Sequence, residues 1–238
     1  MISIINNVLS NNGYELVSIE LSEDIAAKVC LFSASKPCNR EEYFVTLELN
    51  DQSDEMAIIL LEKKAQELFG EISDSGVVDK TFEKNCTMIV CHEEARISLR
   101  TVLALEEDQY NFKKNVIAYD PQEVHAIEEF LAKESIERIT NSLINNIITA
   151  EGGKNFLEFK KSHKSKKDHF SLILKIALKL PFITYIPREQ ELINLDQEVE
   201  SSLSEEQSLI YDQLVNSDKG WDEENTEHQV VAIWGSLQ

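Results

Sequence analysis

Three short apolar runs follow one another near the N-terminus, and each has the length of a β-strand. They are YELVSIEL (residues 14–21), AKVCLFSA (27–34) and EYFVTLEL (42–49). The third run alternates, which predicts a strand whose side chains point to two faces in turn. Its two predicted faces are Tyr43, Val45, Leu47 and Leu49 on one side, and Phe44, Thr46 and Glu48 on the other. The first part of the chain is therefore expected to contain a β-sheet.

Further helices and strands alternate up to about residue 134. A short helix is expected before the strands, over residues 2–13, and a longer one over 55–70, ending at Gly70. CTMIVCHE (86–93) and NVIAYD (115–120) are expected to be the fourth and fifth strands, and the segment 95–108 fits either a helix or a strand with a turn. Pro121 is expected to open a helix over 121–134, since proline suits the first helical position.

The rest of the chain has helical periodicity. Helices are predicted over residues 135–151, ending at a pair of glycines, over 168–180, and over 202–216. The second should place Lys175 and Lys179 on one polar side. The third begins with a capping-box pattern from Ser204 to Gln207.

These patterns predict an α+β fold with three parts. A mixed α/β domain is expected over residues 1–133 and a helical domain over 134–220. Residues 221–238 are expected to form an acidic linker and an apolar docking segment. The apolar side chains of that segment, which we expect to bind a partner or to pack internally, are Val230, Val231, Ile233 and Trp234.

The composition points to an acidic protein of the cytoplasm. The formal net charge is -20, which repels DNA and anionic membranes at long range. The N-terminus has no basic start, and no apolar run is long enough to cross a membrane. Four cysteines without a Cys-x-x-Cys pair favour a reducing compartment. We predict no cofactor, because neither a Gly-x-Gly-x-x-Gly pattern nor a phosphate-binding loop is present.

One stretch reverses the acidic character of the chain. Residues 154–180 contain eight lysines and two acids, a net charge of +6. The centre of this region, KKSHKSKK, is expected to lie in a loop between two helices. Its lysines either contact solvent only or form an auxiliary nucleic-acid contact within a complex; an acidic partner surface or the chain's own acidic tail is a third option. The candidate contact residues are Lys160, Lys161, Lys164, Lys166 and Lys167.

The order of helix, three strands, helix and strand resembles the core of the PD-(D/E)xK nucleases. It leaves open a degenerate restriction-endonuclease-like αβββαβ core. That chemistry needs strand carboxylates for Mg²⁺ and a lysine beside the attacking water. Here Glu48 is followed two positions later by Asn50, and the second strand has no acid. We therefore predict no catalytic residues and no active nuclease.

Cys86, Cys91 and His92 are the residues that most resemble a metal site. Zinc sites use closer pairs and a second pair elsewhere in the chain. On a strand, Cys86 and Cys91 would also point to opposite faces. Buried structural cysteines are the better interpretation, so no metal site is predicted.

The segment EEDQYNFKKNVIAYDPQEV, residues 106–124, together with the layout of the chain, resembles the middle components of ABC-three-component systems. These systems act in bacterial antiphage and antiplasmid defence, and the Lamassu type is among them. The resemblance implies a subunit that joins an SMC- or Rad50-like ATPase to an effector, usually a nuclease. It implies no catalytic residues, and DNA contact only through the assembled complex. The alternatives are a stand-alone nucleic-acid-binding protein that uses Lys160–Lys167, and an enzyme of restriction-endonuclease-like fold with an unrecognised site.

Overall fold

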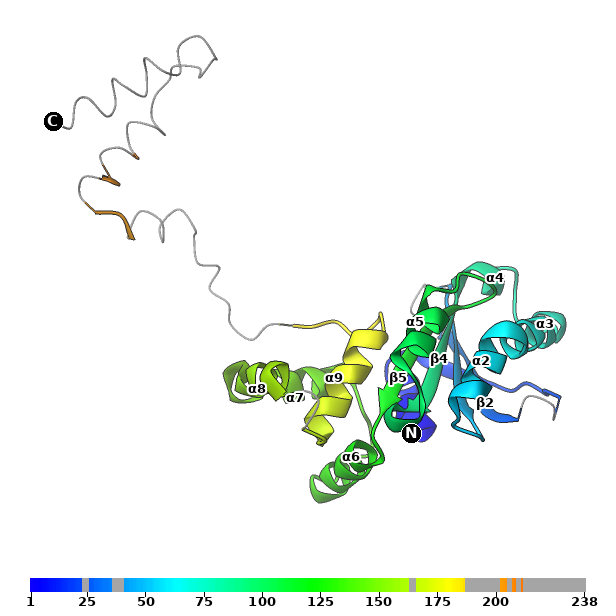
Figure 1. Cartoon of the computed structure of the whole chain (residues 1–238), viewed down its shortest axis with the longest axis horizontal. Coiled ribbons are helices and arrows are strands. Elements are labelled where there is room, and N and C mark those ends of the chain that lie inside the picture. The colour runs from blue at the N-terminus through cyan, green and yellow to red at the C-terminus, as the bar shows by residue number, and fades with distance from the viewer. Residues whose placement is uncertain are drawn as a thin grey trace, which may run out of the picture. The chain divides into compact units, whose positions relative to one another are not determined.

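The computed structural model describes residues 1–22, 26–35, 41–162, 166–186, 202–204, 207–208 and 211 of the 238-residue chain. The chain divides after Ile186 into two units, Met1–Ile186 and Pro187–Gln238. The first unit contains a five-stranded sheet and its covering helices (Figure 1). The fold is therefore mixed α and β, as predicted. The boundaries expected at residues 133 and 220 stay predictions.

The sheet has the order β1-β2-β3-β4-β5. The strands are β1 Tyr14–Val17, β2 Ala27–Ala34, β3 Tyr43–Leu49, β4 Cys86–Glu93 and β5 Lys113–Tyr119. The first three form an antiparallel meander, and β3, β4 and β5 run parallel to one another. Parallel neighbours need crossover connections, which the helical segments after β3 and after β4 supply. All five predicted strands are present, although β1 ends four residues earlier than expected.

The helical elements lie between the strands and, after β5, over much of the described part of residues 120–186. The first group is α1 Ile2–Ser10, α2 Asp54–Ile59, the π-helical η3 Leu60–Lys64, α3 Ala65–Asp74, α4 Phe82–Asn85, the 3-10 turn η4 Glu94–Arg96 and α5 Leu99–Glu107. The second group is α6 Pro121–Lys133, α7 Asn141–Thr149, the 3-10 turn η5 Ala150–Gly153, α8 Lys154–Ser162 and α9 His169–Lys179. The ambiguous segment 95–108 is thus mainly a helix, which begins where the Ser98 side chain accepts a hydrogen bond from Thr101 N.

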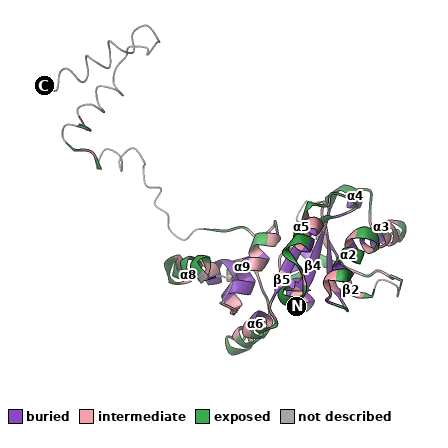
Figure 2. Ribbon diagram, viewed as in Figure 1, coloured by how far each residue is buried: buried purple, intermediate pink, exposed green. Residues whose placement is uncertain are grey.

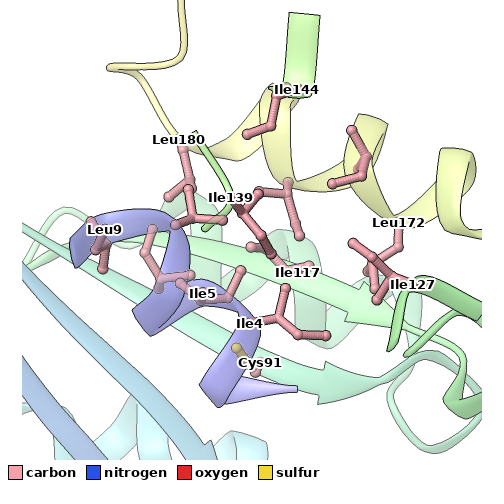
Figure 3. Close-up of a cluster of buried hydrophobic side chains, with 14 of the residues drawn as sticks. Ile4, Ile5, Leu9, Cys91, Ile117, Ile127, Ile139, Ile144, Leu172 and Leu180 are labelled. Atoms are coloured by element: carbon pink, nitrogen blue, oxygen red, sulfur yellow. The ribbon is translucent and has the colours of Figure 1, made fainter. Parts of the chain in front are cut away.

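Helices cover both faces of the sheet, and each face has its own core. Figure 1 shows α2 and α3 on one side and α6, α7 and α9 on the other. The α1 core contains buried side chains from α1, α6, α7 and α9, with Phe44, Cys91 and Ile117 from the sheet (Figure 3). The α3 core contains buried side chains from α2 to α5, with Val45, Leu47 and Val90 from the sheet.

The predicted alternation along β3 is confirmed by these two cores. Val45 and Leu47 lie in the α3 core, whereas Phe44 lies in the α1 core. The two strand cysteines also separate as predicted, because Cys86 belongs to the α3 core and Cys91 to the α1 core. Burial raises the pKa of both thiols, so neither is a reactive thiolate at neutral pH.

Two helix boundaries predicted from the sequence are wrong. Gly70 does not end its helix but lies inside α3. The helix expected from residue 135 begins only after Thr140, whose side chain accepts a hydrogen bond from Leu143 N. Ser135 has a positive φ, and the backbone after it is held by one side chain of α1 and one from the turn that follows α1. Asn7 bonds to Glu137 O and Ile139 N, and Asn12 bonds to Ile139 O and Asn141 N. These side-chain bonds satisfy backbone groups that a helix would otherwise use.

In the second unit, the capping box predicted from Ser204 to Gln207 is present. Gln207 N donates to Ser204 Oγ, and Ser204 N donates to Gln207 Oε1. Most of the predicted helix 202–216 lies outside the described residues.

Candidate partner-binding surface

The lysines of KKSHKSKK do not form a single loop, which corrects the predicted position of the stretch. Lys160 and Lys161 are in the last turn of α8, a helix that the sequence patterns did not predict. Lys166 and Lys167 lie between residues 163–165, which are outside the described residues, and the start of α9. Lys164 lies outside the described residues. The stretch therefore divides into two pairs of lysines in different environments.

The second pair is ion-paired with acids of the same unit. Lys166 Nζ lies 3.4 Å from Glu158 Oε2 and 3.5 Å from Asp168 Oδ2. Lys167 Nζ lies 2.7 Å from Glu94 Oε2. Burial alone would lower the pKa of Lys167, but the hydrogen bond and charge of Glu94 outweigh it and leave the pKa raised. These two lysines have acidic partners already.

Lys167 is part of a larger network that joins α6, α9 and the end of β4. Glu94 also lies 3.0 Å from Lys175 Nζ, which lies 2.9 Å from Glu123 Oε2. Glu123 is fully buried, and its other oxygen accepts a 2.6 Å hydrogen bond from Ser171 Oγ. The pKa of Glu94 is pushed up by burial but lowered overall by its two lysine partners. The network fixes α9 against α6 through charged groups as well as apolar contacts.

The segment 106–124, which carries the resemblance, has structural roles along its length. Lys114 is buried, and its Nζ pairs with Asp108 and donates to Tyr110 O. Glu106 pairs with Lys179 of α9. Asp120 caps α6 in a capping box with Glu123. Each of these polar groups closes a turn or joins two elements.

An apolar groove lies between α8 and α9. It has a volume of about 510 Å³, and we call it the α8–α9 groove. Its apolar lining comes from α7, α8, α9 and the segment after α9: Ile148, Phe156, Leu157, Leu174, Ala177, Leu178, Ile183 and Tyr185. Several of these side chains are exposed, up to 73% for Leu178. Contiguous exposed apolar side chains of this size are typical of interaction sites.

The wall formed by residues 183–186 is held by two asparagines of α7. Asn145 Nδ2 donates to Thr184 O at 2.7 Å, and its Oδ1 accepts from Ile186 N at 2.7 Å. Asn141 Oδ1 accepts from Thr184 N at 3.2 Å. The wall is therefore fixed before any ligand binds, which reduces the entropy lost on binding.

Free positive charge lies on α8, beside this groove. Figure 2 shows that the surface of α8 is largely exposed. Lys154, Lys160 and Lys161 are exposed, and within the described part of the chain none of them makes an ion pair. Lys160 and Lys161 each lie four residues after an apolar groove residue, Phe156 and Leu157. Residues four apart on a helix are neighbours, so charge and apolar surface adjoin.

A second exposed apolar surface lies on α5. Leu99 is 73% exposed, and Leu103 follows it one helical turn later and is also exposed. The buried face of α5 contributes Leu105 to the α3 core, whereas Phe159 of α8 packs on the α1 core. The α5 surface and the α8–α9 groove therefore belong to helices on different faces of the sheet, which meet at its β5 edge through Glu106 and Lys179.

Glu48 is the strand acid that was compared with the PD-(D/E)xK nuclease pattern, and its carboxylate has three partners in the structure. It lies 3.3 Å from the Met1 amino group and 3.7 Å from Lys28 Nζ, and it accepts a hydrogen bond from Tyr119 Oη at 3.2 Å. The structure describes no group of three or more His, Cys, Asp or Glu side chains, in the residues it covers, that could hold a metal ion. Catalytic inactivity stays a prediction.

Two further predictions concern the C-terminal docking segment and membrane-spanning helices. The docking segment Val230, Val231, Ile233 and Trp234 lies outside the described residues. In the part of the chain that is described, no helix has the length and apolarity needed to cross a membrane.

Comparison with known proteins supports one family. Residues 42–147 match the family model described as ABC-three component (ABC-3C) system Middle Component 1. The match runs from just before β3 into α7, less than half of the chain, and includes the segment 106–124. No curated protein and no solved structure matched the chain. The match supports the expected middle component, whereas the Lamassu type stays a prediction.

Proposed function

We propose that this chain, whose residues 42–147 match an ABC-3C middle component, is a non-catalytic adaptor between two other subunits. One is an SMC- or Rad50-like ATPase and the other is an effector, in the Lamassu type of defence against phages and plasmids. The adaptor works in the cytoplasm and meets DNA only within the assembled complex.

The observation that carries this proposal is the pair of exposed apolar surfaces on helices that cover different faces of the sheet. An adaptor must contact two partners without one blocking the other. The α8–α9 groove lies on the side of the α1 core and the Leu99–Leu103 surface on the side of the α3 core, although Glu106 of α5 and Lys179 of α9 meet at the edge of the sheet beside β5. Burying exposed apolar side chains on association is favourable, and contiguous exposed apolar patches mark interaction sites.

The contacts of Glu48 favour an adaptor over the enzyme alternative. Its carboxylate faces the Met1 amino group, Lys28 and Tyr119. The ion pairs of Lys166 and Lys167 favour an adaptor over a stand-alone nucleic-acid-binding protein, since paired lysines attract phosphate less.

Native mass spectrometry of the complex tests the adaptor role. We expect the three chains, co-expressed from neighbouring genes, to form one complex, and the ATPase and effector to separate when this chain is omitted. An ATPase–effector complex that forms equally well without the chain would contradict the proposal. So would DNA cleavage by the isolated chain that a Glu48→Ala change abolishes.

A further inference from the structure

The α8–α9 groove combines an apolar floor with a basic rim. Phe156 and Leu157 project from α8 beside Lys160 and Lys161, and Lys154 precedes them by one turn or less. The other lysines near α9 are neutralised by Glu94, Glu106, Glu123 and Glu158. The free positive charge of this region, as far as it is described, is therefore concentrated where the apolar surface is exposed.

From this arrangement we infer that the α8–α9 groove binds an acidic amphipathic helix of a partner subunit. The apolar face of such a helix would cover Phe156, Leu157 and Leu178, and its acidic flank would pair with Lys154, Lys160 and Lys161. The inference rests on the proposed function, because the helix is assigned to one of the two components that the chain joins.

The shape of the site favours a helix. Two helices and the fixed segment 183–186 form walls around about 510 Å³, room for several large apolar side chains from one helical face. Asn141 and Asn145 hold the outer wall in place. A helix laid between walls of this kind buries side chains at successive turns, as in other helix-in-groove complexes.

The chemistry favours an acidic protein over DNA. A phosphate backbone would pair with the lysines but leave Phe156, Leu157 and Leu178 against water and phosphate oxygens. The net charge of -20 also opposes a polyanion at long range, whereas a short acidic helix carries few charges and gains from apolar burial. The lysines of α8 then select the partner and accelerate its association.

A synthetic peptide tests the inference without any other subunit. The probe is a fluorescent helical peptide with leucine along one face and glutamate on both flanks, titrated into the full-length protein. Its counterpart has lysine in place of every glutamate. We expect the acidic peptide to bind at least about tenfold more tightly than the basic one, with an affinity that falls as salt rises. Equal binding of the two peptides, or binding of neither, would overturn the inference.

Matched variants locate the binding site. Lys160→Glu/Lys161→Glu should weaken binding of the acidic peptide by about tenfold, and Phe156→Ser/Leu157→Ser by at least as much. The charge control is Lys80→Glu/Lys84→Glu, an exposed pair near β4, and the apolar control is Tyr110→Ser, an exposed aromatic side chain. Both controls should leave peptide binding unchanged. A control that weakens binding as much as the groove variants would place the site elsewhere.

Cross-linking identifies the natural occupant. A photo-reactive amino acid replaces Leu157, and the protein is co-expressed with its neighbouring components and mixed with DNA. The expected product joins residue 157 to an acidic helical segment of another subunit. Cross-links to DNA, to a second copy of this chain or to residues after 186 would each overturn the inference. If the complex forms and the groove variants do not affect it, the assignment of a helix to the groove is wrong but the adaptor role stands. If the complex does not form at all, the adaptor role is contradicted.

Discussion

Lys175 Nζ lies 2.9 Å from Glu123 Oε2, and this contact joins α9 to a carboxylate that is fully buried at the start of α6. The same carboxylate accepts hydrogen bonds from Ser171 Oγ and Asp120 N. A buried charge is tolerated when it is paired and its oxygens are hydrogen-bonded. The position of α9, which forms one wall of the α8–α9 groove, therefore depends on a charged contact in the interior.

Lys175→Met should destabilise the protein by about 2–4 kcal/mol, because it leaves Glu123 buried without its cation. Adding Glu123→Gln should recover part of this loss, since the uncompensated charge is then removed. Urea denaturation of wild type, both single variants and the double variant gives the coupling energy. Additive losses in this cycle would mean that the two side chains do not interact.

Glu94 should make the stability depend on acidic pH. Its pKa is lowered by its partners Lys167 and Lys175, so the folded state holds the ionised form more strongly than the unfolded state. The resulting stability is present above the unfolded pKa of about 4.5 and is lost as the pH falls through the lower folded value. Urea denaturation at a series of pH values around and below 4.5 should show a shallower decline for Glu94→Gln than for wild type. Glu83→Gln, which changes an exposed side chain of α4, should decline like wild type.

His169 should add a second pH dependence at higher pH. Its ring stacks on Phe130 with centroids 4.5 Å apart, and burial lowers its pKa, against the attraction of Asp168. The unfolded state therefore takes up the proton first, and stability falls as the pH drops below about 6.5. His169→Gln should flatten melting temperature against pH in this range. His125→Gln, which removes an exposed histidine of α6, serves as the control and should keep the wild-type slope.

Two glycines should respond in opposite ways to alanine. Gly152 has a φ of +63°, which a side chain disfavours, so Gly152→Ala should cost about 1 kcal/mol. Gly70 lies inside α3, where an added Cβ meets nothing within 4 Å, so Gly70→Ala should stabilise by about 0.5–1 kcal/mol. Chemical denaturation of both variants measures the difference. Stabilisation by Gly152→Ala would show that the turn between α7 and α8 is not built as described.

The two apolar surfaces should serve different partners. Leu99→Ser/Leu103→Ser should release one subunit from the complex, and Phe156→Ser/Leu157→Ser the other, because α5 and α8 pack on different cores on the two faces of the sheet. Both double variants replace exposed side chains and should melt close to wild type. Affinity capture through a tag on this chain, followed by quantitative mass spectrometry, shows which subunit each variant loses. Loss of the same subunit from both variants would contradict separate binding surfaces.

Periodicity predicted the strands well, because alternation along β3 reflects two cores that lie directly against the sheet. It failed after α6, where the segment 135–140 has helical periodicity but its backbone is bound by Asn7 and Asn12. These asparagines are more than a hundred residues away in sequence, so no local pattern reveals the contact.

Only part of the candidate binding surface could be predicted from the sequence, because its other parts also depend on contacts between distant residues. Lys160 and Lys161 were recognisable as a basic stretch, but the acids that neutralise Lys166 and Lys167 could not be identified locally. The groove needs α7, α8 and α9 together, and α8 was not expected to be a helix.

The two cores become complete at different times during synthesis. The α3 core uses residues between Leu31 and Val116, all of which leave the ribosome with the sheet itself. The α1 core needs side chains from Phe170 to Leu180 and therefore has to wait for α9. In that interval one face of the sheet is fully covered, and the other is covered only by α1, α6 and α7. Until α9 is made, the apolar side chains that it later covers stay exposed, and such transient exposure favours aggregation.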